Sequence, residues 1–230
     1  MVLRKTYRIP LYEPEAVCYH QNYIYVGTSR DVFKISTKHE EVPQPYIRFT
    51  QEQKSGVTSV ATSGNQLYIL VGITNSNFKV QVHQIATKGS RGAGDESMIR
   101  QWQTDVPYVQ FNKLRVMNDE VIVPDPVNKR FKIYKISGDS KKQFPCDLLA
   151  PGCVSMDVSG NDCVVATVKS TGTVFRFNMK TGNVMWKTAL KEPEGVACYK
   201  DSYVLVTNKN VDNRISILDM YTGKYHVQYL

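Results

Sequence analysis

Residues 192–223 read EPEGVACYKDSYVLVTNKNVDNRISILDMYTG, and residues 13–36 read EPEAVCYHQNYIYVGTSRDVFKIS. Each stretch runs from a Glu-Pro-Glu triplet through a short apolar run to a polar turn, and then to an alternating apolar run that begins at Tyr203 or at Tyr23. The two copies differ by one residue between Val17 and Tyr23, which we place in the turn. A sequence motif that occurs twice in one chain predicts a repeat architecture.

Three further copies lie between these two, beginning near residues 57, 110 and 153. Their runs are short and rich in β-branched and aromatic residues, and none has the period of a helix. Polar pairs typical of hairpin turns separate the first two runs of four units: Gly64-Asn65, Asn118-Asp119, Gly160-Asn161 and Lys200-Asp201. A fourth, more polar run closes most units. Four-stranded antiparallel units that recur every 40–50 residues or so predict the blades of a β-propeller.

The repeat predicts an all-β chain that forms a single propeller domain over residues 1–230, with five blades favoured and six possible. The predicted blades span approximately residues 13–53, 54–105, 106–149, 150–190 and 191–230. Residues 3–9 precede Glu13 much as residues 185–190 precede Glu192, so residues 1–12 are predicted to form a closing or outer strand. We expect the N- and C-terminal strands to meet and close the ring, because an open ring leaves a bare sheet edge.

Composition indicates a cytoplasmic protein. Hydrophobic residues make up 42% of the chain, enough for a sizeable core, but no apolar run approaches the length needed to span a bilayer. The charged N-terminus is unlike a secretory signal. The odd number of cysteines favours free thiols in a reducing compartment, and none has metal-ligand spacing. They are Cys18, Cys146, Cys153, Cys163 and Cys198.

The sequence predicts no enzyme and no cofactor. It contains no GxSxG, HExxH, P-loop or GxGxxG motif. Some propellers hold a channel metal, so a metal-dependent hydrolase or lyase remains the alternative. Glu15, Asp31, Asp125, Glu194 and Asp212 could contribute to such a site, but no histidine joins them.

The net charge of +8 favours an acidic partner. In a propeller the loops between the second and third strands share one face with the loops that lead into the next blade, and here they carry an excess of Lys and Arg. We therefore expect a protein or single-stranded RNA partner at this face, with a tyrosine available to stack on a base. The predicted partner-binding residues are Arg30, Lys129, Arg130, Lys169, Lys209, Arg214 and Tyr108.

Two units also resemble a known repeat. Residues 121–134, VIVPDPVNKRFKIY, resemble the NHL-repeat signature, and residues 203–219, YVLVTNKNVDNRISILD, resemble both that signature and its YVTN variant. Residues 173–186 are similar to quinoprotein-type propeller repeats instead. The chain as a whole resembles the propeller that ends many TRIM-type (TRIM-NHL) ubiquitin ligases. This resemblance implies a substrate-recognition scaffold, with ligase activity residing on a RING domain whose pattern this sequence does not contain. It also implies that Arg130 and Arg214 brace adjacent blades.

Overall fold

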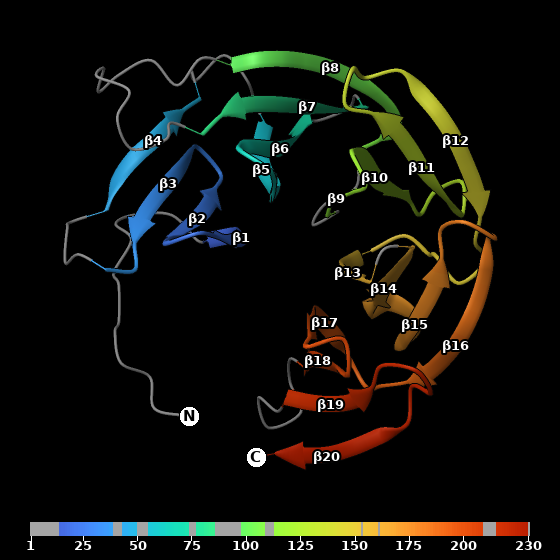
Figure 1. Cartoon of the computed structure of the whole chain (residues 1–230). Coiled ribbons are helices and arrows are strands. Elements are labelled where there is room, and N and C mark those ends of the chain that lie inside the picture. The colour runs from blue at the N-terminus through green and yellow to red at the C-terminus, as the bar shows by residue number, and fades with distance from the viewer. Residues whose placement is uncertain are drawn as a thin grey trace.

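The computed structural model describes residues 14–38, 43–49, 55–73, 77–85, 98–108, 113–152, 154–160, 162–208 and 215–229. These residues form five four-stranded antiparallel sheets, which stand around a central axis (Figure 1). The only helical element among them is a short 3-10 turn, η1 (Lys169–Thr171). The described residues contain no helix of sufficient length and apolar character to cross a membrane. The chain is therefore a five-bladed β-propeller, which confirms the predicted fold class.

Each blade consists of four strands that are consecutive in the sequence, with the first strand innermost and the fourth outermost (Figure 1). Blade 1 contains β1 (Pro14–His20), β2 (Tyr23–Thr28), β3 (Asp31–Ser36) and β4 (Gln44–Arg48). Blade 2 contains β5 (Ser55–Ser63), β6 (Gln66–Ile73), β7 (Asn77–Gln84) and β8 (Met98–Pro107). Blade 3 contains β9 (Arg115–Met117), β10 (Glu120–Asp125), β11 (Arg130–Lys135) and β12 (Ser140–Pro145). Blade 4 contains β13 (Val154–Ser159), β14 (Cys163–Val168), β15 (Thr173–Asn178) and β16 (Asn183–Ala189). Blade 5 contains β17 (Pro193–Tyr199), β18 (Tyr203–Asn208), β19 (Ile215–Asp219) and β20 (Tyr225–Tyr229).

The tight turns between first and second strands use left-handed backbone, as the polar turn pairs predicted. Residues with φ between 50° and 66° occupy these turns, namely Gly64, Asn118, Asp119, Gly160, Lys200 and Asp201. In blade 1 the turn lies between the paired residues His20 and Tyr23, whereas in blade 5 it lies between Tyr199 and Tyr203. The extra residue of the second copy is therefore in the turn, where the sequence placed it.

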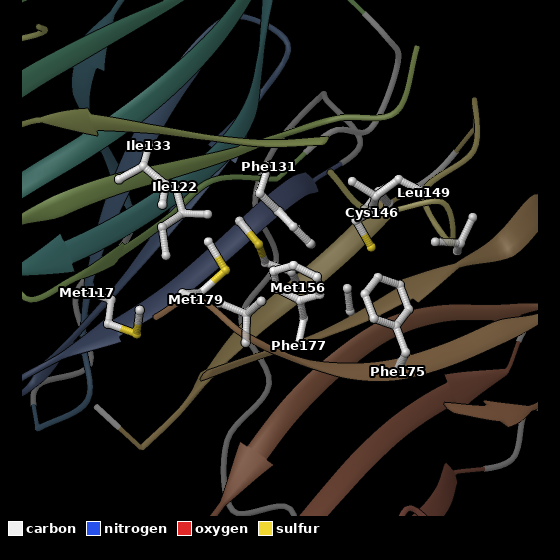
Figure 2. Close-up of a cluster of buried hydrophobic side chains, with 14 residues drawn as sticks. Met117, Ile122, Phe131, Ile133, Cys146, Leu149, Met156, Phe175, Phe177 and Met179 are labelled. Atoms are coloured by element: carbon white, nitrogen blue, oxygen red, sulfur yellow. The ribbon is translucent and has the colours of Figure 1, made fainter. Parts of the chain in front are cut away.

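Hydrophobic cores fill the spaces between successive blades. Figure 2 shows the core between blades 3 and 4, where Phe131 and Ile133 of β11 meet Met156, Phe175 and Phe177 of blade 4. The rings of Phe131 and Phe177 lie 5.0 Å apart, and both side chains are almost wholly buried. Burying a side chain of this size contributes about 1.5–3 kcal/mol, so these cores hold the blades in place.

Each outermost strand is bulged against the third strand beside it. In blades 2 to 5 a bulge falls at corresponding points of the ladder, at Ile99, Lys141, Met185 and His226, whereas in blade 1 it falls two residues nearer the start of the third strand, at Tyr46. The pairing of β7 with β8 has a second irregularity, between Asn77 and Lys79. A bulge increases the local twist of a strand, so the outer strands of blades 2 to 5 bend at the same place.

Blades 5 and 1 do not pack as the other neighbours do. Strand contacts join blade 1 to 2, 2 to 3, 3 to 4 and 4 to 5, but no comparably extensive contact joins the described strands of blades 5 and 1. No described strand stands between them in Figure 1. The strand predicted over residues 1–12, which was expected to close the ring, lies outside the described residues. We term this region the open interval.

Candidate functional site

The first strands of all five blades surround a cavity of about 930 Å³ on the axis. The polar side chains in its wall are Ser59, Lys113, Arg115, Ser155 and Asp157, among others, and the apolar ones include Val17, Val60, Val116, Val158 and Val196. A cavity of this size is within the range of ligand pockets, so the chemistry of its charged groups decides what it can do.

Lys113 ties three blades together at the wall of the cavity. Its Nζ donates hydrogen bonds to the backbone oxygen of Thr58, at 2.7 Å, and to that of Glu15. Glu15 and Thr58 are the extra residues of bulges in β1 and β5, where the strand ladder skips a residue. A bulge leaves a residue unpaired in the ladder, and the ammonium group satisfies the carbonyl oxygens that the two bulges present.

A second set of contacts ties blades 3, 4 and 5. Arg115 Nε donates to Asp157 Oδ1 at 3.0 Å, and Asp157 Oδ2 accepts a hydrogen bond from the backbone N–H of Cys198 at 2.8 Å. The side chains of Arg115 and Asp157 are 21% and 27% exposed, so water screens this pair only in part. We term Lys113, Arg115 and Asp157 the axial polar network. Its hydrogen bonds brace the inner strands, although its members also line the cavity.

The thiols beside this network are poor nucleophiles. Burial raises the pKa of Cys18 to about 12, against the opposing effect of Arg115. Burial and the Asp157 carboxylate raise the pKa of Cys198 to about 12 as well. Both groups are therefore protonated at neutral pH, whereas the reactive form of cysteine is the thiolate. The four cysteines that the structure describes are free, and the described residues contain no cluster of three or more His, Cys, Asp or Glu side chains suited to a metal ion.

The predicted loop residues that the structure describes lie at one end of the ring. Arg30 lies between β2 and β3, Lys129 and Arg130 lie where β10 turns into β11, and Lys169 is in η1 between β14 and β15. The first strand of the next blade begins at the same end, since Lys169 Nζ reaches Glu194 Oε1 of β17 at 2.5 Å. Lys209 and Arg214 lie outside the described residues.

The hydrogen bonds of the Arg130 side chain are made within blade 3. Its Nε donates to Asp125 Oδ2 at 2.9 Å, and its Nη1 donates to Gln143 Oε1 at 2.8 Å. Asp125 is fully buried and also accepts hydrogen bonds from the backbone and side-chain nitrogens of Asn128. These partners belong to blade 3, so Arg130 fixes the loop between β10 and β11 and does not brace adjacent blades as the resemblance implied.

Tyr108 is packed into blade 2. Its ring lies 5.4 Å from that of Phe78, and it covers Gly72 so closely that a Cβ added at Gly72 would lie 2.1 Å from a ring carbon. Burial and the Glu15 carboxylate raise the pKa of its hydroxyl. Arg130 and Lys169 form ion pairs, and Arg30 of blade 1 and Lys129 of blade 3 have exposed side chains.

The structure also shows an apolar surface that the sequence prediction missed. Cross-strand pairing places one set of blade 5 side chains on the face turned away from blade 4: Ala197, Tyr199, Tyr203, Leu205, Ile215 and Ile217. We term this set the open face. Ile215 and Tyr199 are 46% and 48% exposed. On blade 1, Val17 and Tyr19 are 63% and 64% exposed, which is unusual for large apolar side chains of an inner strand.

A signal for this surface is present in the sequence. Leu205 and Ile217 alternate with the core residues of the same strands, so both faces of blade 5 are apolar.

Comparison with known proteins identifies the fold and no family. No protein-family model matches the chain. No curated protein matches it either. A chain of the nidogen–laminin complex is similar with a TM-score of 0.71 at 12% identity, over 96% of this chain and 81% of that one. A protein of unknown function from Bacteroides caccae is similar with a TM-score of 0.68 at 9% identity, over 96% and 82%.

The computationally designed protein Ika8 is also similar, with a TM-score of 0.58 and 16% identity over 94% of this chain. The chain spans 61% of that protein's length. Identities this low show a shared propeller architecture. They do not assign the NHL or TRIM-type identity that the two repeat units resemble.

Proposed function

We propose that this propeller is a non-enzymatic scaffold that binds a partner protein on the side where blades 5 and 1 fail to pack. The observation that supports the proposal is the open face, together with exposed Val17 and Tyr19 at the edge of the cavity. Contiguous exposed apolar surface bounded by polar loops is typical of protein-binding sites.

Two of the carboxylates suggested for catalysis form ion pairs, Asp125 with Arg130 and Glu194 with Lys169. Asp157, which the structure places in the cavity wall, pairs with Arg115. Asp212 lies outside the described residues. A general base needs a free lone pair within reach of a substrate proton, and a metal ligand needs one directed at the ion. A channel-metal hydrolase or lyase is therefore the weaker proposal. Elemental analysis of the purified protein tests it, because a stoichiometric metal would favour the enzyme.

A protein partner is favoured over RNA because several of the side chains suggested for RNA binding already have partners within the fold. Binding single-stranded RNA requires cations that are free to meet phosphates and aromatic rings that are free to stack on bases. Arg130 and Lys169 are ion-paired, and Tyr108 is packed on Gly72. The remaining exposed loop cations lie on separate blades.

Within this proposal, the resemblance to NHL and YVTN repeats suggests a finer role. The chain would act as the substrate-recognition module of a TRIM-like ubiquitin ligase, with catalysis on another domain. One structural neighbour comes from a complex between two proteins, which is compatible with the use of a propeller as a protein-binding platform.

The experiment is affinity capture with the full chain from RNase-treated lysate of cells that express it. We expect one or a few proteins to be retained, to be lost with Ile215→Asp on the open face, and to be kept with Lys129→Glu on the loop face. Circular dichroism of both variants checks that they fold.

Fluorescence anisotropy with random RNA oligomers provides the opposing test. RNA affinity that falls steeply with salt and disappears in an Arg30→Glu, Lys129→Glu variant would overturn the protein-binding proposal in favour of RNA.

A further inference from the structure

The axial cavity has an apolar side and a charged side. Blades 1, 2 and 5 contribute most of the apolar side chains of its wall, including Val17, Tyr19, Val60, Ala61, Val196 and Ala197. Blades 3 and 4 contribute Lys113, Arg115, Ser155 and Asp157. A cavity that combines an apolar wall with a few convergent polar groups suits a small ligand that has an apolar body and one polar group.

The apolar side is open to the cavity. Val17 and Tyr19 belong to the innermost strand of blade 1, yet they are 63% and 64% exposed. Val60 and Val196, by contrast, are almost wholly buried in the cores between blades. Water that contacts exposed apolar surface is released when an apolar ligand covers that surface, and this release favours binding.

On the charged side, the hydrogen bonds within the wall leave donors in excess. Arg115 donates from Nε to Asp157 Oδ1 and from Nη1 to the backbone oxygen of Leu114 at 2.9 Å. Asp157 Oδ2 accepts from the backbone N–H of Cys198, so both carboxylate oxygens have a partner. Arg115 Nη2 has no hydrogen-bond partner among the residues that the structure describes. A guanidinium carries five N–H donors, and those not used here need an acceptor.

Ser155 supplies a second donor beside Arg115. It lies two residues before Asp157 on β13, so the two side chains are on the same side of blade 4. Ser155 is 8% exposed, and its hydroxyl makes no hydrogen bond to any other described residue. A hydroxyl buried to this extent usually has a partner, which an acceptor on a bound molecule would supply.

The other two charged residues of the wall belong to the end of the cavity where the first strands begin. Lys113 Nζ is held by the backbone oxygens of Thr58 and Glu15. Burial and the Glu15 carboxylate together raise the pKa of the Tyr108 hydroxyl, which places this carboxylate near blade 2. Arg115 is therefore the cation to which we assign recognition.

We propose that the axial cavity binds a small organic acid, with its carboxylate at Arg115 and Ser155 and its apolar body against Val17 and Tyr19. Arginine recognises carboxylates through charge-assisted hydrogen bonds, and its planar fork fixes their orientation. This inference goes beyond the proposed function. It concerns the axis of the ring, and it holds or fails independently of a partner protein at the open face.

The test is isothermal titration calorimetry of the full chain with octanoate and with octanamide, both below the concentrations at which they aggregate. The two probes have the same apolar chain, and only octanoate is charged. We expect octanoate to bind at one site per chain, with a Kd about 10-fold or more below that of octanamide, because hydrogen bonds to a charged group are the stronger ones.

Four variants locate the site. Arg115→Gln should bring the ratio of the two Kd values to about 1 and change octanamide binding by less than about 3-fold. Asp157→Asn keeps the cation and removes the opposing carboxylate, so the ratio should stay the same or rise. Val17→Gln should weaken both probes by about 5-fold or more. Ile215→Asp, on the open face, should change neither.

Circular dichroism checks that each variant folds, and a ratio measured on one protein sample does not depend on the fraction that is folded. Four results would overturn the proposal: no saturable binding of octanoate, equal Kd values for the two probes with the parent chain, a preference for octanoate that survives Arg115→Gln, or binding lost with Ile215→Asp. The last result would place the probe on the open face. Failure to capture a protein partner would contradict the proposed function and leave the calorimetric result standing.

Discussion

The interface between blades 3 and 4 and the open interval between blades 5 and 1 are built from corresponding positions of one repeat. In the first, Phe131, Phe175 and Phe177 lie together in one cluster (Figure 2), and each is at most 1% exposed. In the second, Ile215 and Val17 remain 46% and 63% exposed. The difference teaches that corresponding positions of the repeat are buried where the next blade packs against them and partly exposed on blade 5, where no described blade packs against them.

Truncation of one large apolar side chain from each region should give the largest contrast. Phe131→Ala removes a buried ring and leaves a cavity, so we expect a loss of about 3–5 kcal/mol in the free energy of unfolding. Ile215→Ala on the open face should change it by no more than about 0.5 kcal/mol. Urea denaturation followed by tryptophan fluorescence measures both, and comparable losses for the two variants would mean that the open face is already covered.

Gly72→Ala tests a closed part of blade 2 with an intermediate effect. A methyl group at Gly72 would lie 2.1 Å from the ring of Tyr108, which must then leave its place beside Phe78. Overpacking of this kind costs about 1–3 kcal/mol. Thermal unfolding of Gly72→Ala and of Gly56→Ala, a strand position where an added methyl would meet its nearest atom only at 3.6 Å, would separate the clash from the general cost of replacing glycine. If Tyr108→Ala in the Gly72→Ala background failed to relieve any of the loss, the packing explanation would be wrong.

Asp157→Ala tests whether the axial polar network braces the blades. The change leaves Arg115 Nε and the backbone N–H of Cys198 without their acceptor, and we expect a loss of about 1–2 kcal/mol in the free energy of unfolding. Asp162→Ala, at an exposed turn, is the matched control. Equal stability of the two variants would mean that the axial polar network lines the cavity but does not brace the blades.

The smallest effect concerns Asp105, at the outer side of the junction between blades 2 and 3. Partial burial acts to raise its pKa, but hydrogen bonds from Lys132 and Tyr134 outweigh burial and lower the pKa below its ordinary value of 3.8. Because the carboxyl pKa is lower in the folded chain than in the unfolded chain, the charged carboxylate stabilises the folded state at any pH above the unfolded-state pKa. This contribution begins to be lost as the pH falls below about 4.

The Asp105 side chain is 55% exposed, so its contribution should be under about 1 kcal/mol. Urea unfolding of Asp105→Asn and the parent chain at pH 7 and pH 3 measures it. The difference between the two should be smaller at pH 3 than at pH 7, and a difference that persists unchanged at pH 3 would contradict the assignment.

The sequence predicts the architecture well because local rules determine it. Alternating apolar runs and turn pairs such as Asn118-Asp119 specify strands and left-handed turns without reference to the rest of the chain. The one-residue difference between the first and last copies could likewise be placed in a turn. These features depend only on neighbours along the sequence.

The candidate site was harder to predict because it depends on contacts between distant residues. Lys113 reaches the backbone of residues 98 and 55 positions away, and those carbonyl oxygens are available only because two strands bulge. Arg130 and Lys169 look like free cations in the sequence, yet each meets a carboxylate in three dimensions. The open face was missed because alternation shows which residues share a face and not whether another sheet follows.

The extra residue in each outermost strand has a consequence for how the chain tolerates change. At Ile99, Lys141 and Met185 the ladder already skips a position, so an insertion or deletion of one residue there could migrate into the existing irregularity and leave the inner strands in register. The same change within β14, whose residues are buried throughout, would exchange the side chains that face blades 3 and 5. We therefore expect a change in chain length, or an inserted tag, to be tolerated better in the outermost strands than in the inner strands around the axis.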